Sequence, residues 1–174
     1  MGSAEDRPGI VEKGMALGRA IAARDAILLT GATTGVIHVV GKAALDANAT
    51  HIGISPAHDA EEHIERYGLP LDAYNAIIYT GFGLKGRNVV LVRSCDIVVF
   101  IAGSTGSLNE FTIAYDEGKV IGCLMGTGGV ADEIERLVQV FPKRTKAQIV
   151  YDEDPRKLIN DCLAVVRDQV PNVS

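Results

Sequence analysis

The sequence predicts an α/β protein with a doubly wound, mostly parallel sheet that helices cover on both faces. Two observations carry this prediction. Short apolar runs of strand length lack the polar alternation of a half-exposed strand, so both faces of each strand are expected to be buried. Segments with helical periodicity separate these runs along the chain, and alternating strands and helices are typical of a parallel sheet.

The first half of the chain contains helices, strands and two glycine-rich turns. Pro8 suits the first turn of a helix that runs to about Arg24. The following elements are a strand at Ala26–Thr30, a turn at Gly31–Gly35, a helix from Val36 to about Ala47, a strand at His51–Ser55, a polar helix or irregular segment at His58–Arg66, a strand at Ala76–Thr80 and a glycine-rich loop at Gly81–Gly86.

The second half repeats the alternation. Its elements are a helix that opens at Arg87, a strand at Asp96–Ile101, a turn at Gly103–Gly106, a helix opened by Ser107–Glu110, a strand at Lys119–Leu124, a turn at Gly126–Gly129, a helix at Val130–Val140, a strand at Ala147–Tyr151 and a helix at Pro155–Gln169 with Asp154 as its N-cap. Ligands of parallel sheets bind at the carboxyl ends of the strands. We therefore expect the loops at 31–35, 81–86 and 102–107 to share that rim.

A protein of this class usually begins with a strand, but here the first strand is apparently missing. Met1–Arg7 is too polar and too short for one, so it is either an expression remnant before a disordered start or the sign of a chain that starts one strand late. We expect either direct pairing of Ala26–Thr30 with Asp96–Ile101 in a sheet of about six strands, or a segment of another chain between them. A single domain over residues 1–174 is expected, with residues 1–8 flexible.

Composition excludes several classes of protein. Hydrophobic residues make up 47% and charged residues 22%, as in soluble globular proteins. A net charge of -5 without a basic cluster argues against nucleic-acid or membrane partners. No apolar stretch approaches the roughly 18 residues of a membrane span. The three cysteines, Cys95, Cys123 and Cys162, are far apart, which suits a reducing compartment, so we expect a cytoplasmic protein.

An anion site is expected at the junction of the strand at Asp96–Ile101 and the helix that follows it. The turn at Gly103–Gly106 lets the backbone come close to a ligand, and free N–H groups at a helix N-terminus attract anions. Arg87 and Glu110 are the charged groups expected nearest to the anion. The junction therefore predicts a phosphate-bearing ligand.

Each of these residues also has a purely structural interpretation. Ser107 and Glu110 have the spacing of a capping box, in which the glutamate bonds back to the N-cap N–H. Arg87 could be an ordinary helix-surface arginine rather than a bidentate phosphate clamp. The sequence leaves both alternatives open.

The first glycine turn is equally ambiguous. Gly31 and Gly35 could approach a phosphate or simply reverse the chain at positive φ. Thr33 and Thr34 could donate hydroxyls to a phosphate or cap the helix at Val36. His58 and Glu62 have metal-pair spacing, but no third ligand is evident, so we predict no metal site.

The pattern of motifs resembles one superfamily. Ala102–Glu110 is similar to the hallmark PGGxGTxxE of the Rossmann-like LOG ("lonely guy") superfamily, which contains cytokinin-activating phosphoribohydrolases and the molybdenum-cofactor carrier proteins. Arg87 stands at the upstream arginine of these proteins and Asp96 at the acidic residue that opens the strand. Gly31–Gly35 is similar to their first glycine turn, and Gly126–Gly129 resembles the carrier branch in particular.

Three departures from the hallmark bear on activity. Ala102 replaces proline, Ser104 replaces the second glycine, and Ser107 replaces threonine while keeping the hydroxyl. The Cβ of Ser104 stands where the backbone would pass a phosphate. The departures weaken the expectation of hydrolase activity but not that of the fold.

The resemblance implies a binding function. It implies a small phosphorylated ligand, a nucleoside monophosphate or a pterin cofactor, bound at the rim by a carrier or sensor. The alternative is a phosphoribohydrolase that cleaves the N-glycosidic bond of nucleoside 5′-monophosphates, in which Arg87 and Glu110 are catalytic and Glu110 stabilises oxocarbenium charge. The ligand-binding residues would be Gly31, Thr33, Thr34, Gly35, Gly103, Ser104, Thr105, Gly106 and Ser107.

The resemblance also bears on cofactors and assembly. No cofactor is required, although a bound nucleotide or molybdenum cofactor is possible. We expect a homo-oligomer, a dimer or a tetramer. Whether the protein is an enzyme stays open.

Overall fold

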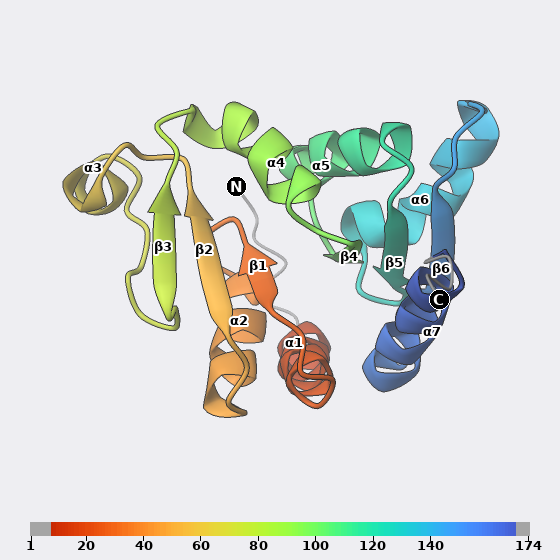
Figure 1. Ribbon diagram of the computed structural model, residues 1–174, viewed down its shortest axis with the longest axis horizontal. Helices are drawn as coiled ribbons and strands as arrows, with labels where there is room; N and C mark the ends of the chain where they lie inside the picture. Colours follow the sequence, from red (N-terminus) through yellow and green to blue (C-terminus); the bar gives the residue numbers. More distant parts are fainter. Residues whose placement is uncertain (1–7, 170–174) are drawn as a thin grey trace, which may run out of the picture. The chain divides into compact units, whose positions relative to one another are not determined.

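Helices and parallel strands alternate along the chain in the computed structural model (Figure 1). The structure describes residues 8–169. Contacts within the chain divide it into two units, the first ending at Ser94 and the second beginning at Cys95. The predicted α/β fold class is therefore confirmed, with its elements divided between the two units.

The first unit is built around a parallel sheet with the strand order β1-β2-β3. Its elements are α1 (Pro8–Ala22), β1 (Leu28–Thr30), α2 (Val36–Asp46), β2 (His51–Ser55), α3 (Ala60–Glu65), β3 (Ala76–Tyr79) and α4 (Gly83–Arg93). Thr30 lies opposite Gly53, and Ser55 lies opposite Tyr79. Helix α1 packs closely along α2 because Gly18 has no side chain: a Cβ there would lie 2.3 Å from the carbonyl oxygen of Val40.

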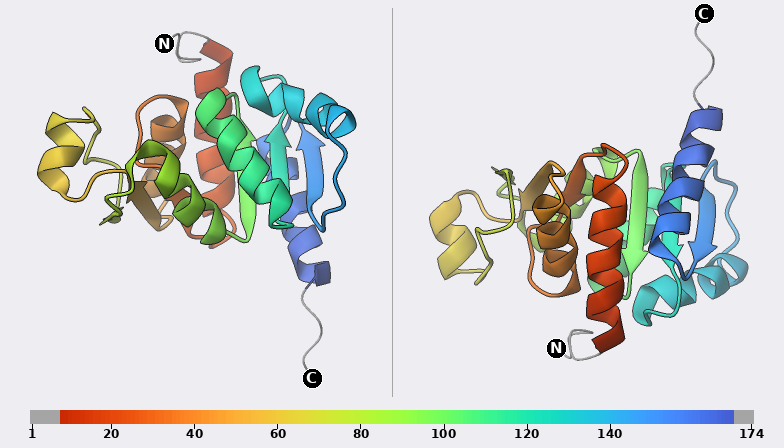
Figure 2. Two further views of the ribbon diagram at one scale, coloured as in Figure 1. Left: turned by 90° about the horizontal axis from the view of Figure 1, so that it is seen from above. Right: turned by 90° about the horizontal axis from the view of Figure 1, so that it is seen from below.

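The second unit has a parallel sheet with the order β4-β5-β6. Its elements are β4 (Ile97–Ile101), α5 (Thr105–Asp116), β5 (Val120–Leu124), α6 (Gly129–Val140), β6 (Gln148–Asp152) and α7 (Pro155–Gln169). Helix α7 covers one face of this sheet, and α6 covers the other (Figure 2). Every residue of the central strand β5 is buried, which explains why its sequence has no polar alternation.

Helix α7 bears out the predicted cap. The carboxylate oxygen Oδ1 of Asp154 accepts hydrogen bonds from the backbone N–H of Arg156 at 2.7 Å and of Lys157 at 3.0 Å. These bonds satisfy two amides that have no partner inside the helix.

Two predicted helix starts are wrong. Helix α4 begins at Gly83 rather than at Arg87, because the chain reversal ends at two glycines with positive φ, Gly81 (68°) and Gly83 (66°). Arg87 therefore lies in the second turn of α4. Helix α5 begins at Thr105 rather than at Ser107, because the reversal after β4 ends at Gly103 with a φ of 98°.

Among the described residues, β1 pairs with β2, β4 pairs with β5, and each unit has one three-stranded sheet. The expected pairing of Ala26–Thr30 with Asp96–Ile101 would join the two units and stays a prediction. The expectations for residues 1–7 lie outside the described part of the chain. No helix between residues 8 and 169 is long and apolar enough to cross a membrane.

Candidate functional site

Two of the predicted site residues meet in the first unit, where Arg87 lies on the backbone of Gly31. Gly31 follows the last residue of β1, and Arg87 comes from α4. A Cβ on Gly31 would lie 1.9 Å from Nη1 of Arg87, so no side chain fits there. Arg87 is only 5% exposed, and its interpretation as an ordinary surface arginine is therefore wrong. Glycine at this position lets the guanidinium reach the carboxyl end of β1.

The turn that begins with Gly31 leads directly into α2. Ala32 and Gly35 adopt left-handed backbone conformations, with φ values of 51° and 84°. Thr33 is half-buried and Thr34 is exposed. The N-cap of α2 is Gly35, so neither threonine occupies the capping position. Their predicted contact with a ligand stays a prediction.

A buried hydrogen-bond chain that the sequence analysis missed begins at Thr30, the last residue of β1. Oγ1 of Thr30 lies 2.8 Å from Nε2 of His51, and Nδ1 of His51 lies 2.5 Å from the carbonyl oxygen of Ala73. Thr30 is 6% exposed and His51 is fully buried. Burial lowers the pKa of His51. The available signal was a threonine and a histidine at the ends of otherwise apolar strands.

In the second unit, the chain turns sharply between β4 and α5. Ala102 (φ 50°) and Gly103 (φ 98°) make the turn, and Ser104 is the N-cap of α5 but forms no side-chain capping bond. The backbone N–H of Leu108 donates to the carbonyl of Ser104 at 2.9 Å. The amides that precede Leu108 have no carbonyl to bond within the helix, which makes this N-terminus suitable for an anion.

The capping-box interpretation of Ser107 and Glu110 is wrong. Because α5 begins at Thr105, Ser107 is already the third helical residue and Glu110 lies in the second turn. The side chain of Ser107 packs on Gly103 instead: a Cβ on Gly103 would lie 2.6 Å from its Oγ. Glu110 is half-buried.

The glycine turn at Gly126–Gly129 holds the turn at Ala102 and Gly103 in place. The backbone N–H of Ala102 donates to Oγ1 of Thr127 at 2.8 Å, and this hydroxyl donates to the carbonyl of Leu124 at 2.7 Å. The carbonyl of Gly103 accepts a bond from Val130 N–H at 3.2 Å. A Cβ on Gly129 would lie 2.2 Å from that carbonyl oxygen, so the close approach of the two turns requires glycine.

The turn at Gly126–Gly129 already binds a carboxylate of the protein, that of Asp132. The two carboxylate oxygens of Asp132 accept hydrogen bonds from the N–H groups of Gly126 and Gly128, both at 2.8 Å. These amides are therefore occupied within the protein, and the turn supports Gly103 rather than offering an anion site. Thr127 and Asp132 are supporting residues that sequence reasoning missed.

The thiols of the protein are poor nucleophiles. Burial raises the pKa of Cys95 to about 11, and it raises the pKa of Cys123 and of Cys162 to about 12. A thiol with such a pKa is protonated at neutral pH and unreactive.

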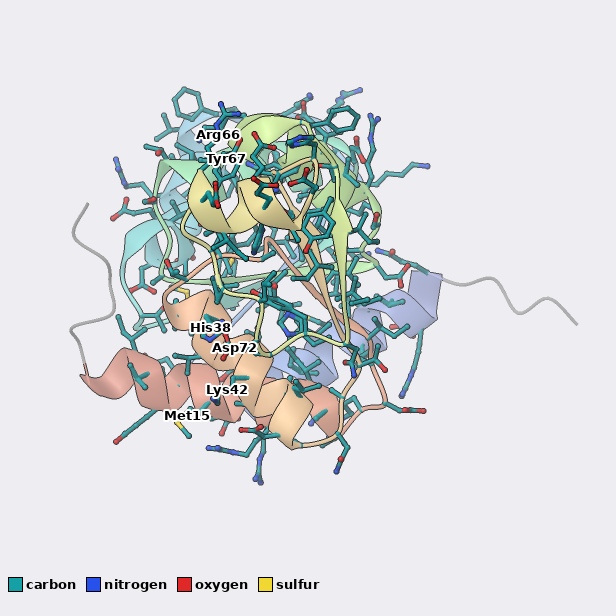
Figure 3. All side chains as sticks on the ribbon, turned by 90° about the vertical axis from the view of Figure 1, so that its left-hand side faces the viewer. Met15, His38, Lys42, Arg66, Tyr67 and Asp72 are labelled. Atoms are coloured by element: carbon teal, nitrogen blue, oxygen red, sulfur yellow. The ribbon has the colours of Figure 1, made fainter. Side chains whose placement is uncertain are left out.

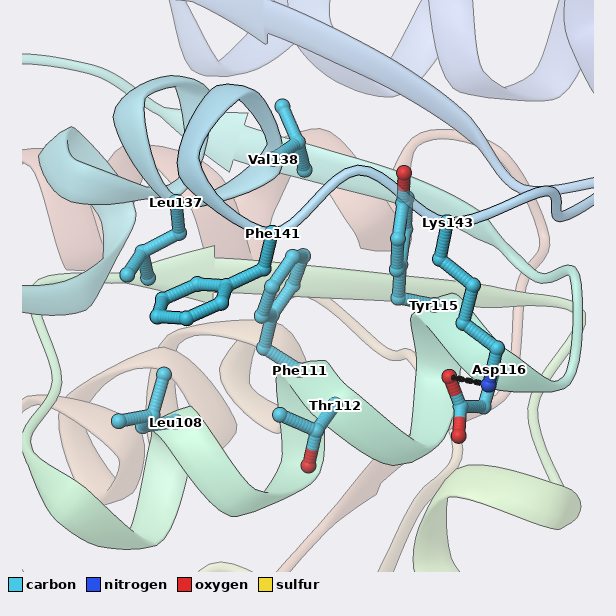
Figure 4. Close-up of a pocket in the computed structure, with 9 residues that line it drawn as sticks. All are labelled: Leu108, Phe111, Thr112, Tyr115, Asp116, Leu137, Val138, Phe141 and Lys143. Carbon is cyan, nitrogen blue, oxygen red and sulfur yellow. Dashed lines mark hydrogen bonds and ion pairs between the residues drawn. The ribbon is translucent and has the colours of Figure 1, made fainter.

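A separate apolar hollow of about 290 Å³ lies in the second unit between α5, α6 and the segment after α6 (Figure 4). Its lining residues are Leu108, Phe111, Thr112, Tyr115, Asp116, Leu137, Val138, Phe141 and Lys143. None of the predicted site residues is among them. Nζ of Lys143 and Oδ1 of Asp116 form an ion pair at 2.5 Å at its edge.

Charged side chains on the first unit pair with one another. Oε2 of Glu62 accepts a hydrogen bond from His58 at 2.5 Å, and Oε1 pairs with Arg66 at 2.5 Å. These bonds lower the pKa of Glu62 to about 2. Asp72 lies beside His38, 3.6 Å from its Nε2 (Figure 3). Within residues 8–169, no three or more His, Cys, Asp or Glu side chains are placed to hold a metal ion.

The sequence matches one family model and one curated relative. The model described as the SLOG cluster4 family matches residues 1–159. An uncharacterized protein of Archaeoglobus fulgidus is 29% identical over 108 residues, which cover 62% of this chain and 66% of that protein. The chain thus spans just under two thirds of that relative's length.

Solved structures share the fold. The structural genomics target TM1055 superposes with a TM-score of 0.77 at 24% identity, over 98% of this chain and 95% of that one. The molybdenum cofactor binding protein of Rippkaea orientalis gives a TM-score of 0.70 at 23% identity, over 91% of this chain and 89% of that one. The molybdenum cofactor carrier protein of Chlamydomonas reinhardtii gives 0.66 at 24% identity, over 94% of each chain.

Proposed function

The chain belongs to the SLOG cluster4 family of the LOG-like superfamily, and from this membership we propose that it binds a small phosphorylated, nucleotide-like ligand as a carrier or sensor. The family match confirms the resemblance seen in the motifs. Proteins named for binding or carrying the molybdenum cofactor share the fold, which supports a carrier role and makes a pterin nucleotide one candidate cargo.

The N-terminus of α5 is the observation that carries the proposal. Ser104 forms no side-chain capping bond there, and the amides of Thr105, Gly106 and Ser107 precede the first bond within the helix. A phosphate would bond to these amides and benefit from the helix dipole. Glycine at 106 leaves room beside the backbone, since a Cβ there would meet nothing within 4 Å.

The first unit offers a contact of another kind, a guanidinium. Arg87 carries a planar guanidinium that suits bidentate recognition of a phosphate. Its contact with Gly31 and its 5% exposure hold it in one place, so little side-chain entropy is lost on binding. In the first unit we assign ligand contact to Arg87 and to the turn Gly31–Gly35. In the second unit we assign it to residues 103–107.

A carrier or sensor leaves its ligand intact, and this separates the proposal from hydrolysis. The test is calorimetry with AMP, with adenosine as the matched probe without a phosphate, and a chromatographic assay for released adenine. We expect AMP to bind, adenosine to bind at least tenfold more weakly, and no adenine to form. Equal binding of the two probes, or failure of both, would overturn the phosphate assignment.

Release of adenine that Glu110→Gln abolishes would instead identify a phosphoribohydrolase. A mass spectrum of the small molecules that copurify with the protein, including a search for a pterin, would identify the class of cargo.

A further inference from the structure

Phe82 presents an exposed aromatic ring at the carboxyl edge of the sheet in the first unit. It is the third residue after β3 and the N-cap of α4. Phe82 is 65% exposed, and none of the ring contacts within residues 8–169 involves it. A single exposed phenylalanine is common on protein surfaces, so the position of the ring decides whether it bears on function.

The position of Phe82 relates it to the glycine turn that begins at Gly31. Strands β1, β2 and β3 are parallel, so the residues that follow them lie at the same edge of the sheet. Gly31 follows β1, Phe82 follows β3, and β2 lies between these strands (Figure 1). Neighbouring strands are about 4.8 Å apart, so the ends of β1 and β3 are separated by roughly 10 Å. A nucleoside monophosphate bridges such a gap from its phosphate to its base.

Hydrogen bonds fix the loop that carries Phe82. Three consecutive carbonyls at the end of β2, those of residues 55–57, accept bonds from residues 80–83. These bonds run from Thr80 Oγ1 to the carbonyl of Ser55 at 2.7 Å, from Gly81 N–H to that of Ala57 at 2.8 Å and from Gly83 N–H to that of Pro56 at 3.0 Å. The N–H of Phe82 donates to Oγ1 of Thr80 at 3.3 Å. The backbone on both sides of the ring is therefore held in place.

Three glycines surround Phe82 and add no side chain beside its ring. A Cβ on Gly86 would lie 2.9 Å from the Cβ of Phe82. Gly81 and Gly83, on either side of Phe82, have φ values of 68° and 66°, a conformation that residues with a side chain rarely adopt. The ring is thus presented by a fixed backbone, so little ordering entropy is lost when another ring stacks on it.

We propose that the flat heteroaromatic ring of the ligand, a purine or a pterin, stacks on Phe82. This inference rests on the proposed function, because it takes the phosphate of the same ligand to lie at Gly31 and Arg87. Stacking covers apolar surface on both rings and tolerates different heterocycles. Phe82 therefore selects a phosphorylated ligand that has such a ring over a sugar phosphate that has none.

The first experiment compares AMP with ribose 5-phosphate, which has the phosphate and the sugar but no base. In calorimetry, Phe82→Ala should weaken AMP binding about tenfold, the factor that corresponds to a lost base–aromatic stack. Binding of ribose 5-phosphate should not change. Phe141→Ala is the matched control, since Phe141 is 68% exposed and lines the hollow of the second unit instead. It should bind both probes as wild type does.

Two results of this experiment would overturn the inference. One is an AMP affinity that does not change in Phe82→Ala, and a smaller particle in light scattering would then assign Phe82 to a contact between two copies of the chain. The other is an equal loss of affinity for AMP and for ribose 5-phosphate, which would show a general disturbance of the site.

A second experiment detects the stack directly and covers the case in which Phe82→Ala does not fold. The chain has no tryptophan, so Phe82→Trp introduces a single indole whose fluorescence reports on this position alone. AMP should quench this fluorescence, ribose 5-phosphate should not, and a pterin in place of AMP shows which heterocycle stacks better. Phe141→Trp is the control and should respond to none of these probes. Unquenched fluorescence with both AMP and the pterin would overturn the inference.

Failure of the proposed phosphate site gives a different pattern. Ribose 5-phosphate then does not bind, and AMP binds no better than adenosine. Adenosine still decides the inference in that case, because it carries the purine without the phosphate. Quenching by adenosine in Phe82→Trp, but not in Phe141→Trp, supports stacking on Phe82, and the absence of quenching overturns it.

Discussion

The hydroxyl of Thr127 accepts a hydrogen bond from the backbone N–H of Ala102 at 2.8 Å and donates one to the carbonyl of Leu124 at 2.7 Å. The side chain is 1% exposed, so it is the partner of two buried backbone groups at the turn between β4 and α5. The geometry of the proposed phosphate-binding turn therefore depends on a residue 25 positions later in the sequence.

Thr127→Val should destabilise the protein by about 1–3 kcal/mol, the cost of leaving buried polar groups without a partner. Thr127→Ser keeps the hydroxyl and should stay within about 1 kcal/mol of wild type. Urea unfolding of the three proteins measures the difference. Equal stability of the valine and wild-type proteins would show that the hydroxyl does not hold the turn.

Gly31→Ala should displace the guanidinium of Arg87, because the added Cβ would lie 1.9 Å from Nη1. We expect a loss of about 1–3 kcal/mol in the free energy of unfolding, as for other overpacked sites, together with weaker binding of AMP. Gly9→Ala is the matched control, since its Cβ would meet nothing within 4 Å. If both variants behaved like wild type in calorimetry and urea unfolding, the contact between Gly31 and Arg87 would affect neither AMP binding nor stability.

Arg87→Ala should weaken AMP binding by about 1.5–3 kcal/mol, the range for hydrogen bonds to a charged group. Arg87→Lys should recover only part of this loss, because a lysine keeps the charge but not the planar fork. Arg93→Ala, on the same helix but exposed, removes an equal charge and should leave affinity unchanged. Calorimetry that gave equal losses for positions 87 and 93 would indicate a general charge effect instead of a specific contact.

The ion pair between His58 and Glu62 should contribute to local stability only within a pH window. Bonds from His58 and Arg66 lower the pKa of Glu62 to about 2, so its contribution is complete above the ordinary pKa of 4.5 and is lost as the pH falls toward 2. The bond to Glu62 raises the pKa of His58 above its ordinary value of 6.5. The histidine contribution is complete below pH 6.5 and is lost as the pH rises through that higher pKa.

An NMR titration of both side chains measures this window. In Glu62→Gln, the pKa of His58 should return toward 6.5, because the bond to the carboxylate, the largest cause of the raised pKa, is gone. A His58 titration curve that does not change in this variant would contradict the pairing.

The alternation of elements could be read from the sequence because each element has a local signal. The strand His51–Ser55 and the helix Pro155–Gln169 have the predicted bounds, since apolar runs and the Asp154 cap act within a few residues. The starts of α4 and α5, which follow glycine-containing loops, were predicted four and two residues late. Several backbone conformations are open to such glycines, and packing against other segments selects one.

By itself, the sequence determined that the chain is an α/β protein of the LOG-like type, with glycine turns after its strands at Gly31–Gly35 and at Gly103. Tertiary structure alone decided the contacts made there. It buried Arg87 on Gly31, joined Ala102 to Thr127 by a hydrogen bond, and linked Thr30 through His51 to Ala73. These contacts join residues from 21 to 56 positions apart, so no local pattern encodes them, and they form only when the strands and helices pack and remove water from their polar groups.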